Sequence, residues 1–565
     1  MVFSRLQIIA ELCARKGIED VIICPGSRSA PLTLAFIRNG KFRCRIIADE
    51  RSAGFIALGL TQSTSKPVIV ICTSGTAAYN LAPAVAEAFF QHLPLLVFTA
   101  DRPAEWLDQL DGQTIRQARL YGVHVKNFYE WPKSDDHPET AWHTNRMINE
   151  ALNLSAEIPA GPVHINFPFR EPLYPKEGSS VPTEQIRVIE SVSARPRLSE
   201  AQWRELESAL RKSKSVLIVP GQQDADDELI QVLNRVHQNK PRWVFAGDIL
   251  SNHHGLPFFC SHSDTFLGQL GDEEKSHLQP DLLITYGKSL VAKNLKLFLR
   301  KYAPRQHWHI HAAGQVADTF QHLSHHIQMH PSDFFQHLQG LNLADIPEDY
   351  AQLWNGYERK AAGLIHQFFQ SQTDGEFAAV KKLLSALPQP CHLHLANSMA
   401  VRYANHIGLS VESRGVKVFS NRGTSGIDGC TSTAVGHSLG SRLSQVLITG
   451  DMAFFYDRNA FWNEYPTPNL FIMLLNNHGG IIFNLIDGPS SMPEAEKYFV
   501  TRQSLKAKAL AAEFGLHYHD LSSIQWSDFF VQAGKAHILE VEGAQDENKE
   551  IFEAFRKHLK KGYAT

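Results

Sequence analysis

GDMAFFYDRNAFWNEYPTPNLFIMLLNNHGGIIF, residues 450–483, decides the fold of this chain. Its run LFIMLL and the preceding SQVLIT (444–449) have the apolar composition of buried strands. Asp451 and Asn477 therefore follow two neighbouring strands, at the carboxyl ends where open α/β sheets bind ligands. A carboxylate, an amide oxygen and a glycine carbonyl suit Mg²⁺ completed by phosphate oxygens. The alternative is a pair of ordinary strand-to-helix loops with polar caps.

The same alternation of strands and helices extends outward through the chain. In the first segment, the runs DVIIC, CRIIAD, PVIVICTSG and PLLVFTADRP are separated by helical stretches, one of them AAYNLAPAVAEAFF. This pattern predicts doubly wound parallel sheets. Weakly periodic or polar connections near 175–198 and 335–380 divide the chain. The sequence therefore predicts three consecutive α/β domains, at residues 1–180, 195–345 and 375–565.

Length and composition limit the classes of protein. A chain of 565 residues is too long for one core. Its formal net charge of −3 argues against general nucleic-acid binding, and the basic run Arg556-Lys557…Lys560-Lys561 is interpreted as the solvated end of a last helix. No apolar run is long enough to span a bilayer. Seven cysteines without a CxxC pair indicate reduced residues of a cytoplasmic protein.

The sequence has no common phosphate-binding motif and no clear histidine metal site. The chain has neither GxxxxGK[ST] nor GxGxxG after a strand, which argues against a P-loop enzyme or a standard dinucleotide enzyme. His307, His309 and His311 alternate on one face of a predicted strand. Metal binding by them is possible, but solvent-facing histidines are the favoured interpretation. The pairs His253-His254 and His325-His326 are also predicted to lie on the surface.

Polar residues that folding does not require follow several predicted strands. They are Ser27 and Arg28 in PGSRSAP, Glu50 in DER, Arg102 in ADRP, Ser398 and Arg402 in NSMAVR, and Arg422 in SNRGTSGIDG. Ser398 and Arg402 are four residues apart and share a helix face. A single arginine of this kind is more often a surface ion pair. Together, four arginines indicate a substrate with several carboxylates, because the guanidinium fork matches carboxylate geometry.

At this point a resemblance can be named. The GD…NNxG arrangement resembles the diphosphate-binding motif of thiamine diphosphate enzymes. The wider set resembles the MenD family, the 2-succinyl-5-enolpyruvyl-6-hydroxy-3-cyclohexene-1-carboxylate synthases of menaquinone biosynthesis. It comprises CPGSRSAPLTL, ADERSAGFIALGL, TSGTAAYNLAPAVAEA, TADRP, GQTIRQ, HINFPFREPLY, NSMAVR, SNRGTSGIDG, GDMAFFYD and NNHGGIIF. These blocks occur in family order from residue 24 to about 486.

The resemblance implies a pyruvate decarboxylase-like architecture. The first domain would bind the aminopyrimidine of the cofactor, and the last would bind its diphosphate. It also implies a homodimer or homotetramer, with each active site between the first domain of one subunit and the last domain of another. Glu50 and Asp451, far apart in sequence, would then meet across subunits.

The family also implies the cofactor contacts. Asp451, Asn477 and the Gly479 carbonyl would hold Mg²⁺, or Mn²⁺, on the diphosphate. Glu50 would hydrogen-bond N1′ of the aminopyrimidine and promote proton removal from the thiazolium; the alternative is a helix-initial Glu that complements the helix dipole. The cofactor-binding set is Glu50, Ser398, Ser425, Ile427, Gly450, Asp451, Asn477, Gly479, Ile482 and Phe483.

The implied reaction is a transferase reaction. Decarboxylation of 2-oxoglutarate would give a succinyl carbanion equivalent, which adds 1,4 to isochorismate. Catalytic roles fall to Glu50, Gln113, Ser398 and Arg402. The substrate-binding set is Ser27, Arg28, Arg102, Gln113, Lys293, Arg402, Arg422, Phe483 and Ile486, with Ile427 and Ile482 as further apolar walls that exclude water.

Two residues depart from some relatives of the family. Gly112 stands where some have Asn, and Asn294 stands where some have Arg, so a carboxylate contact could be weakened or moved to a neighbour. Residues 450–452 read GDM where thiamine diphosphate enzymes often read GDG, and the predicted metal ligand Asp451 is retained. The alternatives are another thiamine diphosphate-dependent decarboxylase or carboligase, which would not need the arginines, and a catalytically silent relative.

Overall fold

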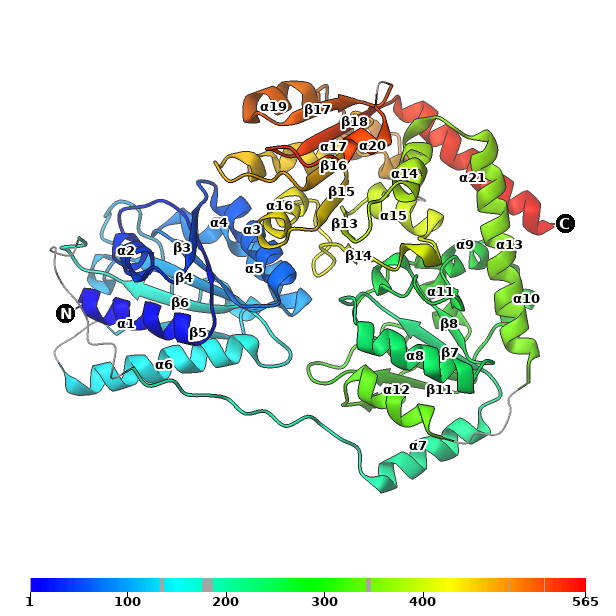
Figure 1. Ribbon diagram of the computed structural model, residues 1–565, viewed down its shortest axis with the longest axis horizontal. Helices are drawn as coiled ribbons and strands as arrows, with labels where there is room; N and C mark the ends of the chain where they lie inside the picture. Colours follow the sequence, from blue (N-terminus) through cyan, green and yellow to red (C-terminus); the bar gives the residue numbers. More distant parts are fainter. Residues whose placement is uncertain are drawn as a thin grey trace.

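The chain forms three six-stranded parallel sheets, each covered by helices (Figure 1). In the computed structural model, residues 2–132, 137–174, 186–341, 347–486, 488–522 and 524–564 are described. Residues 186–198 have no regular structure and run as a long connection from the first sheet towards the central one (Figure 1). The predicted α/β fold class is confirmed.

The first sheet has the strand order β2-β1-β3-β4-β6-β5. β1, β3 and β4 are buried along their whole length, as expected for apolar strands with helices on both faces. AAYNLAPAVAEAFF forms two helices rather than the single predicted one, because Pro83 lies in the first turn of the second. The elements are α1 (Val2–Arg15), β1 (Asp20–Ile23), α2 (Ala30–Asn39), β2 (Arg43–Ile46), α3 (Glu50–Thr64), β3 (Val68–Cys72), α4 (Thr76–Asn80), α5 (Ala82–Gln91), β4 (Leu95–Asp101), β5 (Asn127–Glu130), α6 (Pro138–Ala156) and β6 (Val163–Pro168).

The central sheet has the order β12-β11-β10-β7-β8-β9. This is the order of a dinucleotide-binding sheet, in which the chain moves outward from one middle strand and then from its neighbour. The elements are α7 (Glu200–Lys212), β7 (Val216–Pro220), α8 (Asp227–Asn239), β8 (Val244–Ala246), β9 (Phe259–Cys260), α9 (Ser263–Leu267), α10 (Asp272–His277), β10 (Leu282–Tyr286), α11 (Lys293–Lys301), β11 (Gln306–Ile310), β12 (His325–Ile327) and α12 (Pro331–Gln339).

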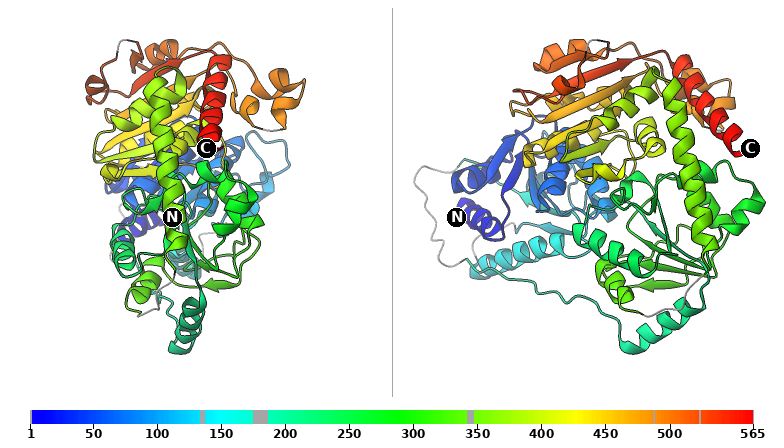
Figure 2. Two further views of the ribbon diagram at one scale, coloured as in Figure 1. Left: turned by 90° about the vertical axis from the view of Figure 1, so that its right-hand side faces the viewer. Right: turned by 45° about the vertical axis from the view of Figure 1, so that its right-hand side comes forward.

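The last sheet repeats the order of the first, as β14-β13-β15-β16-β18-β17. The long helix α13 precedes it, extends from the central sheet to the last one, and packs along the C-terminal helix α21 (Figure 2). The elements are α13 (Asp349–Ser371), α14 (Gly375–Ser385), β13 (Cys391–Leu395), α15 (Met399–Ile407), β14 (Val416–Phe419), α16 (Cys430–Gly440), β15 (Ser444–Gly450), α17 (Asp451–Tyr456), β16 (Leu470–Asn476), α18 (Ile482–Leu485), α19 (Ala507–Phe514), β17 (His517–Asp520), α20 (Trp526–Phe529), β18 (His537–Glu542) and α21 (Gln545–Ala564).

Helices α3 and α16 join the two outer sheets within one chain (Figure 1). They approach closely at two glycines. A Cβ on Gly59 would lie 2.1 Å from the carbonyl oxygen of Thr433, and a Cβ on Gly436 would lie 2.1 Å from that of Ile56. Only glycine permits this backbone contact.

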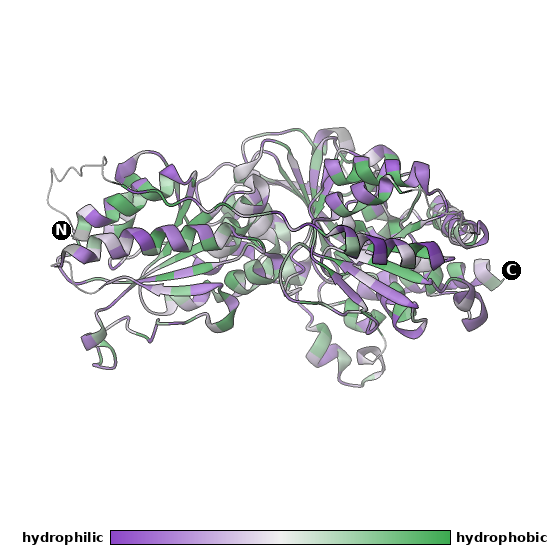
Figure 3. Cartoon of the chain, turned by 90° about the horizontal axis from the view of Figure 1, so that it is seen from below, coloured by the Kyte–Doolittle hydropathy of each residue, from purple (hydrophilic) through white to green (hydrophobic). Residues whose placement is uncertain are grey.

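The apolar residues form several cores, one of which includes strands of both outer sheets. The covering helices carry hydrophobic and hydrophilic residues in alternation, as amphipathic helices do (Figure 3). All seven cysteines are free. In the described part of the chain, no helix combines the length and the apolar character needed to cross a membrane.

Candidate active site

A cavity of about 600 Å³ opens at the carboxyl edge of β13, β15 and β16. We call it the main cavity. Many of the predicted site residues line it: Ser398, Arg402, Arg422, Ser425, Ile427, Gly450, Asp451, Asn477, Gly479, Ile482, Phe483 and Ile486. The tertiary structure thus brings together four separate segments that follow strands of the last sheet.

The predicted metal ligands are adjacent because β15 and β16 are neighbouring parallel strands, with Gly450 opposite Leu475. Asp451 and Asn477 are buried, with exposed fractions of 2% and 5%. Burial raises the pKa of Asp451, which the hydrogen bond from Gln503 and the neighbouring amides of Met452 and Gly479 oppose. A buried carboxylate and amide facing a cavity are a donor set suited to a hard divalent cation.

Gly479 lies where no larger residue fits. Its φ is +156°, and a Cβ would lie 2.6 Å from Nε2 of Gln545 and 2.9 Å from the Val500 carbonyl oxygen. Glycine fits here without displacing Gln545 or the backbone of Val500. The predicted glycine ligand position is consistent with this geometry.

Glu376 is a site residue that the sequence did not reveal. It lies in the first turn of α14, lines the main cavity, and accepts a hydrogen bond from Nδ2 of Asn477 at 2.8 Å. Burial raises its pKa to about 8, and its Oε2 has no hydrogen-bond partner among the described residues. In sequence, it looks like any acidic residue at a helix start.

Two glutamines complete the surroundings of the predicted ligands. Gln503 donates to Oδ2 of Asp451 at 2.7 Å, and Gln545 donates to Oδ1 of Asn477 at 3.4 Å. Both lie far downstream of the ligands in the chain. With Glu376, they fix the orientation of the two side chains, as outer-shell groups commonly do around metal sites.

Arg402 and Arg422 bring positive charge to the cavity. Arg402 donates to the carbonyl of Ser398 at 2.6 Å, and Arg422 donates to Oδ1 of Asn397 at 2.9 Å. Within the described residues, neither arginine forms an ion pair with a carboxylate, and Nε of Arg422 is buried without a partner. Ser398 has a φ of +75°, an unfavourable backbone conformation for a serine. Both guanidinium groups therefore remain available to an anion.

The glycine-rich loop that carries Arg422 is held by the other two sheets. Glu87 of α5 accepts hydrogen bonds from the amides of Gly423 at 2.9 Å and Thr424 at 2.6 Å. Gln91 of α5 and Gln222, in the loop after β7, both donate to the Ser420 carbonyl, at 2.9 and 2.8 Å. All three domains thus meet at this loop.

The remaining predicted residues of the first sheet lie outside the main cavity. Ser27 and Gln113 are exposed. Arg28 is buried, donates to the Phe169 carbonyl at 3.1 Å and pairs with Glu171 at 3.5 Å. Arg102 pairs with Asp111 at 3.2 Å and donates to the Gly112 carbonyl. They form a second group at the carboxyl edge of the first sheet.

Glu50 begins α3, and its carboxylate accepts a hydrogen bond from Asn80 at 3.3 Å. It does not line the main cavity of its own chain. Its neighbours tie α3 to the last sheet, because Asn459 donates to Asp49 and Arg51 donates to the Tyr456 carbonyl. Glu50 and the predicted metal ligands therefore belong to separate groups within one chain.

Lys293 also lies outside the main cavity, on an adjoining cavity that includes Arg402. Asn294, next to it, is engaged by Asp264, whose carboxylate accepts its amide proton at 2.5 Å and whose carbonyl accepts from Nδ2 at 2.9 Å.

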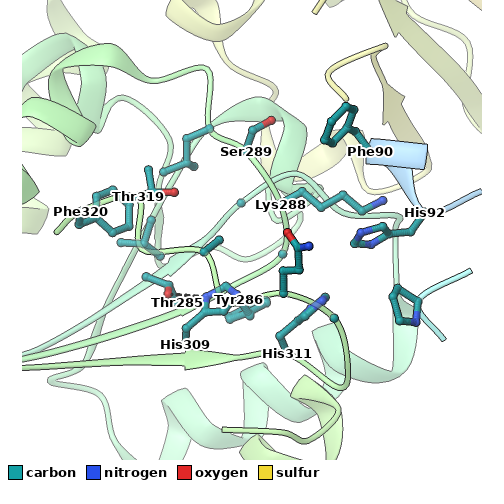
Figure 4. Close-up of a pocket in the computed structure, with 18 of the residues that line it drawn as sticks. Phe90, His92, Thr285, Tyr286, Lys288, Ser289, His309, His311, Thr319 and Phe320 are labelled. Carbon is teal, nitrogen blue, oxygen red and sulfur yellow. Dashed lines mark hydrogen bonds between the residues drawn. The ribbon is translucent and has the colours of Figure 1, made fainter. Parts of the chain in front are cut away.

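The alternating histidines of β11 line a further cavity, of about 550 Å³, between the first and central sheets (Figure 4). His307 and His309 are buried, and the Thr285 hydroxyl contacts both rings, at 2.8 and 2.9 Å. Burial lowers the pKa of each to about 4. The predicted solvent-facing position is wrong for these two, and no metal-holding group of histidines and acids occurs among the described residues.

The predicted surface position of His253 and His254 is also wrong. Both are buried, with His253 between the Ser251 carbonyl and the Tyr286 hydroxyl, while His254 contacts the Ser413 carbonyl. His325 and His326 are half-buried on the edge strand β12. Sequence alone cannot separate a histidine that is hydrogen-bonded in a core from one on a surface.

The main cavity fits a diphosphate held through a divalent cation. The side chains of Asp451 and Asn477 lie on its lining, together with Gly479. Beside these polar groups lie the apolar side chains of Ile427, Ile482 and Phe483. A polar end next to an apolar wall suits a cofactor with a charged tail and an aromatic body.

Two segments of the chain match family models of thiamine diphosphate enzymes. Residues 5–120 match the family model "Thiamine pyrophosphate enzyme, N-terminal TPP binding domain", and residues 189–395 match "Middle domain of thiamine pyrophosphate". A solved structure, the thiamine diphosphate-dependent 4-hydroxybenzoylformate decarboxylase of Rhodococcus jostii RHA1, aligns with a TM-score of 0.68. It is 16% identical, covering 96% of this chain and 99% of that one. At that identity it shows the fold alone.

Curated relatives are much more similar. The chain is 42% identical over 99% of both chains to the 2-succinyl-5-enolpyruvyl-6-hydroxy-3-cyclohexene-1-carboxylate synthase of Cytophaga hutchinsonii. It is 38% identical to the synthase of that name from Porphyromonas gingivalis, over 97% of this chain and 96% of the relative. The chain therefore belongs to the 2-succinyl-5-enolpyruvyl-6-hydroxy-3-cyclohexene-1-carboxylate synthase family of thiamine diphosphate-dependent enzymes.

Proposed function

We propose that this protein is a transferase that joins 2-oxoglutarate to isochorismate in menaquinone biosynthesis. The bond between C1 and C2 of 2-oxoglutarate breaks and CO₂ leaves. A carbon–carbon bond then forms between C2 and the acceptor ring, with uptake of one proton. The product is the cyclohexene carboxylate for which the relatives are named.

The observation that carries this proposal is the pair Arg402 and Arg422 beside the predicted metal ligands. Both line the main cavity, and neither is neutralised by a carboxylate of the described chain. A decarboxylase of a simple oxo acid would not need two such groups. Substrates with two carboxylates each would, because the guanidinium fork binds carboxylate oxygens in pairs.

Roles follow for the residues around the cavity. Arg402 and Ser398 hold the carboxylates of the oxo acid, and Arg422 reaches the acceptor. Ile427, Ile482, Phe483 and Ile486 form the apolar wall and keep water from the reacting carbon.

Asp451, Asn477 and the Gly479 carbonyl hold Mg²⁺, or Mn²⁺, and through it the diphosphate of thiamine diphosphate. When bound, the cofactor supplies the thiazolium that accepts the electron pair released on decarboxylation. The protein residues orient this group, bind both substrates and exclude water. Glu376 and Gln545 orient Asn477, and Gln503 orients Asp451.

The site is completed by a second copy of the chain. Glu50 would hydrogen-bond the aminopyrimidine of the bound cofactor and exchange a proton with it, while Ser27, Arg28, Arg102 and Gln113 would bind the acceptor carboxylates. Their position at the edge of the first sheet, outside the main cavity of their own chain, supports this arrangement. The working enzyme is therefore a homodimer or a homotetramer.

The test is an assay of purified protein with 2-oxoglutarate and isochorismate, in which cofactor, metal and each substrate are omitted in turn. Formation of the joined product should require all four. Rapid CO₂ release from 2-oxoglutarate without isochorismate, and no joined product with it, would assign the protein to a different decarboxylase or carboligase activity.

A further inference from the structure

A second cavity, of about 470 Å³, adjoins the main cavity on the side of the C-terminal helix α21. Its walls come from α9 and α11 of the central domain, from α15, and from α21, which lies at the edge of the molecule (Figure 2). The two cavities share Met399, Arg402 and Ile486 in their linings. Arg402 therefore stands at the boundary between them.

The lining of this second cavity is strongly basic, and we call it the basic cavity. Its positive side chains are Lys293, Arg402, Arg556, Lys557 and Lys560. Within the described chain, none of these five forms an ion pair with a carboxylate. Asp264, the carboxylate on the lining, is occupied by the backbone amide of Asn294. The cavity therefore carries a surplus of positive charge.

The basic residues of α21 are held at this position by buried apolar residues of the same helix, which also line the cavity. Phe552, Phe555 and Leu559 are buried. The guanidinium of Arg556 lies 4.8 Å from the centre of the Phe552 ring, and Lys557 and Lys560 project from the exposed side. The interpretation of this run as merely the solvated end of a helix is therefore incomplete, because the run also lines a cavity.

Clustered like charges repel one another and destabilise the fold slightly. In a concave site, the same cluster concentrates anions and accelerates their association. The volume falls within the range of small-molecule sites. The relatives are named for a product with three acidic groups, on its succinyl, enolpyruvyl and ring-carboxylate parts. A basic passage next to Arg402 suits molecules of that charge.

We propose that the basic cavity is the passage through which small di- and tricarboxylates reach Arg402 and leave it, with Lys557 and Lys560 as its outer anion-attracting groups. This proposal rests on the proposed function, which supplies the anionic substrates. Lys557 and Lys560 act on capture of the substrate and do not touch the reacting atoms.

The test variant is Lys557→Gln/Lys560→Gln, and the matched control is Lys549→Gln/Lys561→Gln. The control changes the charge of the same helix equally, at residues that do not line the cavity. The test variant should raise KM for both substrates about threefold to tenfold while kcat changes less than twofold. Its kcat/KM should also fall less steeply with added salt than that of the wild type, because fewer charges remain to be screened. The control should match the wild type in KM and in the salt dependence of kcat/KM.

Unchanged KM and salt dependence in the test variant would overturn the proposal, as would an equal effect in the control. Calorimetric binding of isochorismate, which needs no turnover, separates this proposal from the proposed function. Weaker and less salt-dependent binding in the test variant would support the passage even if the wild type formed no product. If the test variant bound isochorismate as the wild type does, the passage would be rejected even if the enzyme were active.

Discussion

The first and last sheets share one strand order, yet different side chains follow their corresponding strands. In the last sheet, Asp451 follows β15 and Asn477 follows β16, which together offer oxygens to a cation. At the equivalent position of the first sheet, Arg102 follows β4 and offers hydrogen-bond donors to an anion. The same architecture therefore carries two different sets of polar side chains, which the proposed function assigns to complementary halves of one site.

The two helices that join these sheets, α3 and α16, also differ in the residues near their starts. Gly59 lies nine residues after Glu50, and Gly436 lies nine residues after Ile427. Each glycine contacts the backbone of the other helix, but Glu50 is the first residue of α3, whereas Ile427 lies in the loop before α16. The start of α3 carries a carboxylate, and the loop before α16 carries an apolar residue that lines the main cavity. Under the proposed function, these residues meet across two copies of the chain.

The largest expected effect is on the last sheet. Asp451→Ala should lower kcat/KM on the order of 10⁴-fold, since a metal ligand contributes several kcal/mol. The purified variant should also lose thiamine diphosphate on gel filtration with Mg²⁺. Asp528→Ala, an exposed acid far along the chain, serves as the control. Tight retention of the cofactor by Asp451→Ala would contradict the ligand assignment.

Glu50→Gln tests the residues at the edge of the first sheet. It should retain the cofactor yet turn over about 10²–10⁴-fold more slowly, because it removes a proton-transfer group and not a binding group. Mixing this variant with Asp451→Ala under conditions of subunit exchange should restore part of the activity, since one site of a mixed dimer has both residues intact. No recovery from a mixture proven to contain mixed dimers would refute a site shared between subunits.

Glu376→Leu should weaken metal binding about 10–100-fold, because Asn477 loses the acceptor that orients it. Titration with Mn²⁺ measures this without turnover. Glu376→Gln keeps an oxygen acceptor and should bind within a few-fold of the wild type. Equal affinity in all three proteins would show that Asn477 is oriented without Glu376.

The smallest expected effect is on the contact between α3 and α16, which joins the two outer sheets. Gly59→Ala places a Cβ against the Thr433 carbonyl and should lower the free energy of unfolding by about 1–3 kcal/mol. Gly363→Ala, on the exposed side of α13 with open space around it, should leave it unchanged or raise it. Thermal unfolding of both variants checks this. Equal stability would mean that α3 and α16 separate readily.

Local pattern was enough to predict much of this protein. Buried parallel strands appear as apolar runs of strand length, so the α/β class and most strands could be predicted. Asp451 and Asn477 could be paired in advance because neighbouring parallel strands bring their carboxyl ends to one edge. The arginines could be grouped because their motifs end strands.

What the tertiary structure decided involves contacts between distant segments. Glu376 gains its role only because α14 packs its first turn against Asn477. His253 and His307 are buried because helices and loops cover them, which no local period encodes. The basic residues of α21 line a cavity because the helix folds back beside Arg402. The sequence by itself determined the sheets and the residues at their edges, since these follow from short-range periodicity. Only the packing of one segment on another determined which side chains face a common space.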